Sequence, residues 1–147
     1  MRIVGGKHRS RILLRLEGKG TRPTMDKVRE ALYGRLGNWV EGKVVLDLFA
    51  GTGSVALEGI SRGMESAVLV DGSAAAIDVI KKNVVALKED ERCMILRMEA
   101  MQALRYLRNK EKKFDFIYLD APYGKVDLAK ILRLFYEYGL LAHEGIV

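Results

Sequence analysis

The chain has 147 residues, of which 49% are hydrophobic and 30% charged, a size and balance typical of one globular domain with its own core. No apolar run approaches the roughly 18–20 residues of a membrane span, the N-terminus lacks the apolar core of an export signal, and one cysteine with two widely separated histidines offers neither a disulfide nor a metal-ligand motif. The composition therefore predicts a cytoplasmic protein without a membrane partner or a metal, and its net charge of +6 raises the question of where that charge lies.

The excess positive charge lies at the front of the chain. Residues 1–35 carry ten Lys or Arg against three acids, a balance of +7, whereas the other 112 residues hold 15 basic and 16 acidic groups, a balance of −1. Residues 2–17 read as two short extended runs around Gly5-Gly6, which predicts a basic N-terminal β-hairpin arm over residues 1–20. Such a cluster is typical of a protein that binds a polyanion such as nucleic acid. The alternative is a solvated hairpin without a partner.

The rest of the chain predicts one α/β domain over residues 21–147. Thr21-Arg22-Pro23-Thr24 forms a rigid turn, and Thr24 can cap a helix over residues 25–36. After Gly42, near-continuous apolar runs alternate with helical spacing. They predict strands over 43–49, 67–70, 93–98 and 114–119, and helices from the glycine loop to Gly63 and over 74–87, 100–109 and 126–138. This alternation favours a Rossmann-like, mostly parallel sheet with helices on both faces. Residues 144–147 read as a fifth strand that stops at once, so we expect a fragment or a sheet whose further C-terminal strands are missing.

A glycine loop follows the first strand of this pattern. In Asp47-Leu48-Phe49-Ala50-Gly51-Thr52-Gly53-Ser54 the glycines let the backbone approach a ligand at the carboxyl edge of the sheet. Asp71 ends the next strand, where a carboxylate can accept both hydroxyls of a ribose. A dinucleotide and S-adenosylmethionine both fit this pairing. A carboxylate at Asp47 would repel a pyrophosphate but would suit the ammonium of S-adenosylmethionine, which favours the latter. The predicted cofactor residues of the loop are Asp47, Phe49, Ala50, Gly51, Thr52 and Gly53.

Acidic residues also follow the third and fourth strands. Glu99, with Ala100 after it, could accept a hydrogen bond from an adenine amino group, or could be an exposed acid that favours the start of a helix. Residues 120–123, Asp-Ala-Pro-Tyr, suit a planar base that carries an amino group: the Asp120 carboxylate accepts from the N–H, and the aromatic ring of Tyr123 stacks on the base. Taken alone, such a string is also a common loop.

Together these motifs resemble the RsmD family, bacterial enzymes that methylate a guanine at its exocyclic amine in small-subunit ribosomal RNA. The resemblance runs along the whole chain and rests on residues 2–6 with the basic stretch after them, 21–30, 46–53, 57–58, 61–63, 119–120 and 122–123. It implies S-adenosylmethionine as cofactor and a catalytic set of Asp120, Pro122 and Tyr123. It further implies that small-subunit RNA, naked or within a 30S subunit, is contacted by a monomer through Arg2, Lys7, Arg9, Arg11 and Arg22.

The chain departs from the family pattern at three points. Ala121 stands where the family usually has proline, which leaves the loop less preorganised. Asp71 and Glu99 exchange the usual Glu and Asp at the ribose and adenine positions. The final acid and antiparallel hairpin of the family are not in this sequence, which leaves a sheet edge uncovered.

Other functions share parts of the pattern. A DNA adenine or cytosine amino methyltransferase uses the same two motifs but usually carries a target-recognition insertion. A glutamine methyltransferase for release factors normally has Asn in place of Asp120. A non-catalytic RNA-binding module that retains the fold would suit Ala121, and a nicotinamide-dependent dehydrogenase lacks support because no acid–base pair for hydride transfer is visible.

Overall fold

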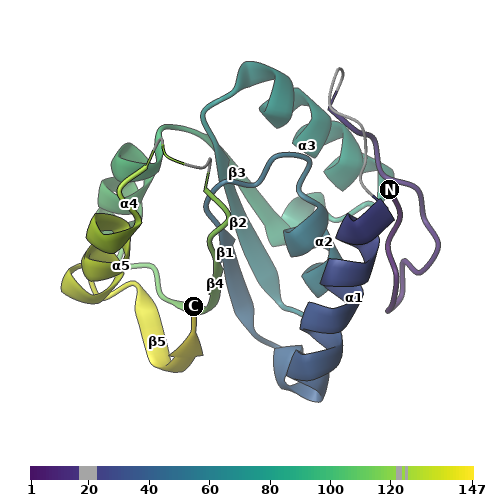
Figure 1. Cartoon of the computed structure of the whole chain (residues 1–147), viewed down its shortest axis with the longest axis horizontal. Coiled ribbons are helices and arrows are strands. Elements are labelled where there is room, and N and C mark those ends of the chain that lie inside the picture. Colours follow the sequence, from purple (N-terminus) through teal and green to yellow (C-terminus); the bar gives the residue numbers. More distant parts are fainter. Residues whose placement is uncertain (17–22, 122–123, 125) are drawn as a thin grey trace.

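The computed structural model describes residues 1–16, 23–121, 124 and 126–147. An N-terminal arm precedes a regular alternation of helices and strands (Figure 1). The elements are α1 (Pro23–Leu36), the short 3-10 helix η1 (Gly37–Val40), β1 (Val44–Asp47), α2 (Ser54–Ser61), β2 (Ser66–Asp71), α3 (Ala74–Ala86), η2 (Asp90–Arg92), β3 (Cys93–Arg97), α4 (Ala100–Asn109), β4 (Phe114–Tyr118), α5 (Leu128–Glu137) and β5 (Leu141–Ile146).

The sheet is parallel and its strand order reverses at β1. Within the described part of the chain the order is β3-β2-β1-β4-β5, and each neighbouring pair is parallel. The chain runs outward from β1 to β3 on one side and then returns to place β4 and β5 on the other. In open parallel sheets a crevice for ligands lies at the carboxyl ends of the two strands where the order reverses, here β1 and β4.

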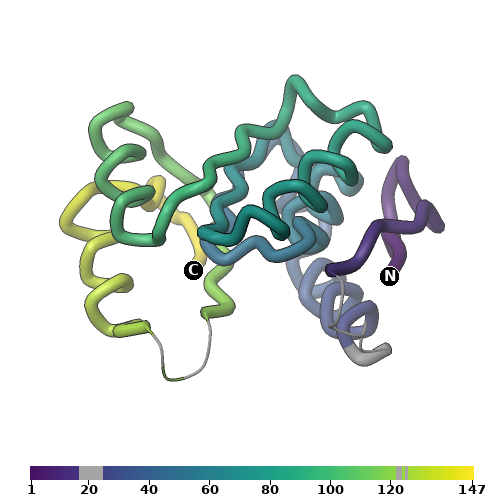
Figure 2. The backbone as a smooth tube through the Cα atoms, turned by 90° about the horizontal axis from the view of Figure 1, so that it is seen from above, coloured from purple at the N-terminus to yellow at the C-terminus, as the bar shows by residue number. Residues whose placement is uncertain are grey.

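Helices cover both faces of the sheet, as the sequence predicted. Alternate residues of the strands point to opposite faces: Val45 and Leu69 pack with α1, α2 and α3, whereas Leu46 and Val70 pack with α4 and α5. Figure 2 shows the arm beside α1–α3, and α4 and α5 at the opposite side of the molecule. The predicted α/β Rossmann-like fold is therefore confirmed.

Most predicted boundaries agree with the structure within two residues, but the fifth strand starts earlier. The sequence predicted its start at residue 144, whereas β5 begins at Leu141, which pairs with Phe114. The polar residues His143 and Glu144 interrupt the apolar pattern, and the register of β5 shifts along this stretch, where Glu144 has a φ of 61°. An irregular edge strand of this kind has no clean alternation for the sequence to display.

The arm is a chain reversal that packs on the domain. Among residues 1–16 its pairing is one antiparallel bridge, Arg2 with Ile12, and not two long strands. The side chains of Ile3 and Leu13 are buried in the same apolar cluster as α1, α2 and α3. The predicted hairpin is thus short, and its apolar residues belong to the core of the domain.

Candidate functional site

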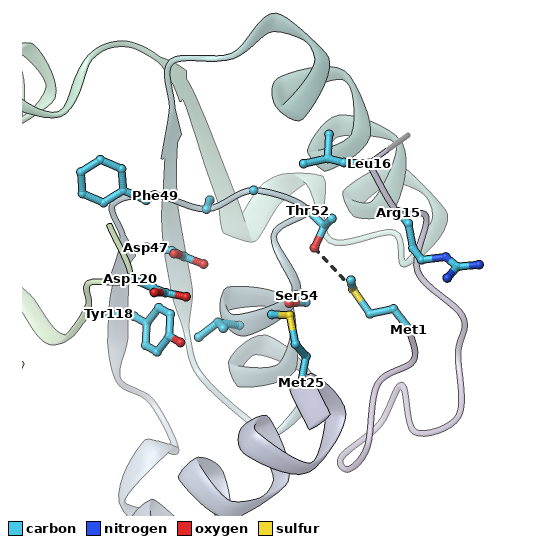
Figure 3. A pocket seen from close by; sticks show the side chains of 13 residues that line it. Met1, Arg15, Leu16, Met25, Asp47, Phe49, Thr52, Ser54, Tyr118 and Asp120 are labelled. Carbon is cyan, nitrogen blue, oxygen red and sulfur yellow. Dashed lines mark hydrogen bonds between the residues drawn. The ribbon is translucent and has the colours of Figure 1, made fainter. Parts of the chain in front are cut away.

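A cavity of about 200 Å³ lies at the crevice between β1 and β4. Asp47 ends β1, and Asp120 comes two residues after the end of β4. Figure 3 shows their carboxylates side by side on one wall, with side chains of the arm on the opposite wall. The lining residues are Met1, Arg15, Leu16, Met25, Asp47, Phe49, Ala50, Gly51, Thr52, Ser54, Val55, Tyr118 and Asp120.

The glycine loop is held by its own turns and by the acid after β2. Gly51 and Gly53 have φ values of 60° and 82°, in the left-handed region that favours glycine. A Cβ at Gly53 would also lie 3.0 Å from the side chain of Leu69, whereas the space beside Gly51 is open. The two carboxylate oxygens of Asp71 accept from the backbone N–H of Gly51 at 3.0 Å and of Ser73 at 2.9 Å. Each oxygen retains acceptor capacity, so Asp71 can hold the loop and still accept from a ligand.

Asp47 is a buried carboxylate with an unused oxygen. Its side chain is 1% exposed, and its Oδ2 has no hydrogen-bond partner among the described residues. The pKa of Asp47 is raised to about 7: burial raises it most, a backbone hydrogen bond from Ala56 lowers it, and the charges of Asp120 and Asp71 also raise it. An unsatisfied buried acceptor on the wall of a cavity suits a cationic or hydrogen-bond-donating ligand group.

Tyr118 joins the two acids at this wall. It is the last residue of β4, and burial together with the charges of Asp120 and Asp47 raises its pKa. Tyr118 was not among the residues predicted from the sequence, although residues two apart on a strand point to the same side and Asp120 stands two positions later. Asp120 itself is exposed at the cavity. The other two predicted catalytic residues, Pro122 and Tyr123, lie outside the described residues.

A second cavity, of about 310 Å³, adjoins the first at Phe49. The predicted cofactor residues Glu99 and Ala100 line it beside Met101, together with residues of α5 and the segment before it. The Glu99 side chain makes no capping hydrogen bond to α4. Instead, the Glu99 carboxylate lies beside Gly72, at the carboxyl end of β2. A Cβ added at Gly72 would come within 2.8 Å of this carboxylate. Most of the predicted cofactor residues therefore border two cavities that share Phe49, whereas Gly53 and Asp71 line neither of them.

The predicted RNA residues of the arm differ in how they are engaged. Lys7 forms an ion pair with Glu89 at 2.9 Å, and Arg11 donates to the carbonyl of Ala86 at 2.9 Å. Arg2 and Arg9 are exposed, and Arg22 lies outside the described residues. Sequence reasoning missed that the arm also lines the first cavity, with Met1, Arg15 and Leu16. No periodic signal could have shown this, because it depends on how the arm folds back.

The arm is attached to α2 through a buried carboxylate. Glu58 is fully buried and accepts from the backbone N–H of Val4 and of Gly5, each at 2.9 Å. It also pairs with Arg62 at 2.8 Å and, at 3.5 Å, with the buried Arg29 of α1. The family resemblance singled out residues 57–58 and 61–63. These residues include Glu58 and Ser61, which hold the arm and are called its socket below.

Ser61 completes this socket. Its hydroxyl donates to the carbonyl of Gly5 at 2.6 Å and accepts from the N–H of His8 at 2.9 Å. Gly6 has a φ of 81°, and a Cβ there would clash with the backbone carbonyl of Ser61. The pair Gly5-Gly6 is therefore a docking element for the arm.

Neither a membrane-spanning helix nor a metal site is found among the described residues. None of the helices found there is long and apolar enough to cross a membrane. The same residues contain no group of three or more His, Cys, Asp or Glu side chains that could hold a metal ion.

The sheet order, the glycine loop after β1 and the acid at the end of β2 define the class I methyltransferase fold. A family model described as Conserved hypothetical protein 95 matches residues 1–147. The chain is 36% identical to YlbH of Bacillus subtilis (strain 168) over 147 residues, covering all of this chain and 80% of that protein. It is 32% identical over 151 residues to Ribosomal RNA small subunit methyltransferase D of Escherichia coli (strain K12), covering all of this chain and 72% of that one. The solved structure of yhhF from Escherichia coli superposes with a TM-score of 0.85 at 29% identity, covering 99% of this chain and 78% of that chain.

The chain belongs to the RsmD family, as its motifs predicted.

Proposed function

We propose that this protein transfers a methyl group from S-adenosylmethionine to the exocyclic N2 of a guanine in small-subunit ribosomal RNA. The observation that carries the proposal is the first cavity, where Asp47 and Asp120 face the glycine loop at the carboxyl ends of β1 and β4. The substrate class follows from the relative in Escherichia coli that is named a small-subunit ribosomal RNA methyltransferase.

The residues present fit the cofactor. The buried oxygen of Asp47, which has no hydrogen-bond partner in the part of the chain that the structure describes, suits the ammonium of the methionyl group, and Asp71 suits the ribose hydroxyls. Glu99 and Ala100 border the second cavity and would receive the adenine, with Phe49 between the two parts. When bound, S-adenosylmethionine supplies an electrophilic methyl group on a sulfonium. Because the space beside Gly51 is open, the backbone of the glycine loop can lie close to the bound cofactor.

Asp120 would orient and activate the target amine. The lone pair of an exocyclic nitrogen is conjugated with the ring, so the amine is a weak nucleophile. The Asp120 carboxylate, with the carbonyl of Ala121, would accept its two N–H groups, aim the lone pair and stabilise the positive charge that develops on nitrogen. The side chain of Tyr118 would border the base, and Pro122 and Tyr123 would complete its binding, the latter by stacking.

The arm would hold the RNA backbone. Arg2, Lys7, Arg9 and Arg11 provide positive charge away from the reacting atoms, and Arg15 provides it at the rim of the cavity. Phosphate contacts position RNA without reading its sequence, and they weaken as salt is raised. We further propose that a monomer acts in the cytoplasm, on naked RNA or on the 30S subunit, and that Arg22 contributes a further contact.

The test is transfer of a labelled methyl group to small-subunit ribosomal RNA, both free of protein and within subunits. Wild type should label guanine N2, and Asp120→Ala should lose at least about 100-fold in rate, the range expected for a group that orients and stabilises the reacting amine. Asp78→Ala, an exposed acid of α3, is the matched control and should retain activity. Label on DNA instead, or equal activity of Asp120→Ala, would refute the proposal. Cofactor binding without any transfer would favour a non-catalytic RNA-binding module.

A further inference from the structure

One buried amide fastens the arm and the glycine loop at the same time. Asn83 of α3 is 2% exposed. Its Oδ1 accepts from the N–H of Leu14 at 2.7 Å, and its Nδ2 donates to the carbonyl of Leu14 at 3.3 Å and to the carbonyl of Thr52 at 3.0 Å. Leu14 belongs to the arm and Thr52 to the glycine loop, so a single side chain joins the segments proposed to bind RNA and cofactor.

Neighbouring contacts join the same two segments. The Thr52 hydroxyl donates to the sulfur of Met1 at 3.4 Å, the contact drawn as a dashed line in Figure 3. Arg15, which follows Leu14 in the chain, lines the first cavity with Thr52. A phosphate bound by Arg15 would therefore lie next to Leu14, the arm residue that Asn83 binds.

The burial of this amide makes the two attachments depend on one another. If the arm moved away, Oδ1 would lose its donor, and if the loop moved, Nδ2 would lose an acceptor. A polar group left unpaired in a buried site is unfavourable. Each attachment therefore favours the other, and a ligand that orders one segment raises the stability of the second. Such coupling acts equally in both directions.

We propose that Asn83 is a positioning residue that couples cofactor binding at the glycine loop to docking of the RNA-binding arm. The inference rests on the proposed function, because it takes the loop as the cofactor site and the arm as the RNA site. A purely structural Asn83 would change the stability of the arm but not the response of the arm to cofactor. That response is the quantity to measure.

The experiment is hydrogen–deuterium exchange of the full chain with and without saturating S-adenosylmethionine. The amides of Val4 and Lys7 report docking of the arm, since they donate to the Glu58 carboxylate and to the carbonyl of Ser61 of α2 at 2.9 Å each. We expect the cofactor to slow their exchange about tenfold in wild type, within the usual range of coupling between sites.

Two variants of Asn83 separate the two attachments, and a third variant is the control. In Asn83→Leu, which has neither attachment, the slowing should fall below about twofold. Asn83→Asp keeps an acceptor for the Leu14 N–H but has no N–H for the carbonyls of Thr52 and Leu14. It therefore keeps one bond to the arm and none to the loop, and it should lose the response even where the arm stays docked. Asn109→Leu makes the same change at an exposed position of α4 and should respond like wild type.

The outcomes separate this inference from the proposed function. Calorimetric binding of S-adenosylmethionine to wild type without slower exchange at Val4 and Lys7 would overturn the coupling and leave the proposed function intact. Equal slowing in Asn83→Leu, Asn83→Asp and wild type would also overturn it. Failure of wild type to bind S-adenosylmethionine would refute the proposed function and, with it, the inference. Loss of the response in both Asn83 variants, with cofactor binding retained, would support it.

Discussion

Replacing Asp47 by Asn should stabilise the cofactor-free protein at pH 8 and weaken cofactor binding. In the folded protein burial raises the pKa of Asp47 from its ordinary value of 3.8 to about 7. Below pH 4 the carboxyl is protonated in both the folded and the unfolded chain, and it contributes no pH dependence. Between pH 4 and 7 the unfolded chain releases the proton while the folded chain retains it, so the free energy of unfolding falls as pH rises.

The size of this effect follows from the pKa difference. About three pKa units correspond to about 4 kcal/mol at 1.36 kcal/mol per unit, and the full loss is present above pH 7. Asn is nearly isosteric with Asp and does not ionise. The difference in unfolding free energy between Asp47→Asn and wild type should therefore grow in favour of the variant by up to about 4 kcal/mol between pH 4 and pH 8.

Urea denaturation at several pH values measures this difference, with Asp78→Asn as an exposed control that should show no comparable growth.

Calorimetry measures the effect on cofactor binding. The affinity of wild type for S-adenosylmethionine should rise with pH through about 7, because the ammonium prefers an ionised Asp47. Asp47→Asn should lack that rise and bind more than about tenfold more weakly, the loss expected when one partner of a buried charge pair is removed. A pH-independent stability difference would refute the assignment of Asp47 as a buried group ionising near neutrality, and unchanged affinity would refute its role toward the ammonium.

Three further predictions concern the arm. Glu58→Gln should lower the free energy of unfolding in urea by about 3 kcal/mol, because it removes the ion-pair partner of Arg62 and leaves the buried Arg29 with Asp26 as its counter-ion. A loss below about 1 kcal/mol would contradict the attachment of the arm described above. Gly6→Ala should abolish the exchange protection of the arm amides. Gly42→Ala, also at positive φ but beside open space, should keep that protection and cost only about 1 kcal/mol in thermal unfolding. Equal losses of protection in the two variants would show that the contact with the backbone of Ser61 is unimportant. Arg2→Gln and Arg9→Gln should each reduce the slope of log affinity for small-subunit RNA against log salt by about 0.7–0.9, and a slope equal to that of wild type in a filter-binding titration would exclude a phosphate contact.

The sheet and the strand-end acids could be predicted from the sequence because both follow from local patterns. Buried parallel strands are near-continuous apolar runs, and all such strands end at one edge of the sheet. Knowing the strands therefore places Asp47, Asp71 and Glu99 near each other without any knowledge of packing. The left-handed turns at Gly51 and Gly53 are likewise a local property of glycine.

The attachment of the arm could not be predicted, because it depends on contacts between distant residues. Arg29, in the sequence Asp-Lys-Val-Arg-Glu, reads as part of a solvated helix face, yet it is buried. Glu58 with Arg62 four residues later reads as a surface pair, but the N–H groups of Val4 and Gly5 reach it from 54 and 53 residues away. The partners of a buried charge are set by tertiary structure, and no periodicity in the helix reveals them.

Two of the buried carboxylates among the described residues, Glu58 and Asp47, show how the structure separates a structural acid from a functional one. Glu58 accepts two backbone N–H groups and pairs with two arginines, so its charge is satisfied by the protein itself. Asp47 has an oxygen without a partner among the described residues, borders a cavity and has a pKa raised to about 7. A buried charge that the fold does not satisfy is unfavourable until something else satisfies it. The requirement for a cationic ligand therefore falls on Asp47 and not on Glu58, and cofactor binding should recover part of the stability that the ionised Asp47 removes.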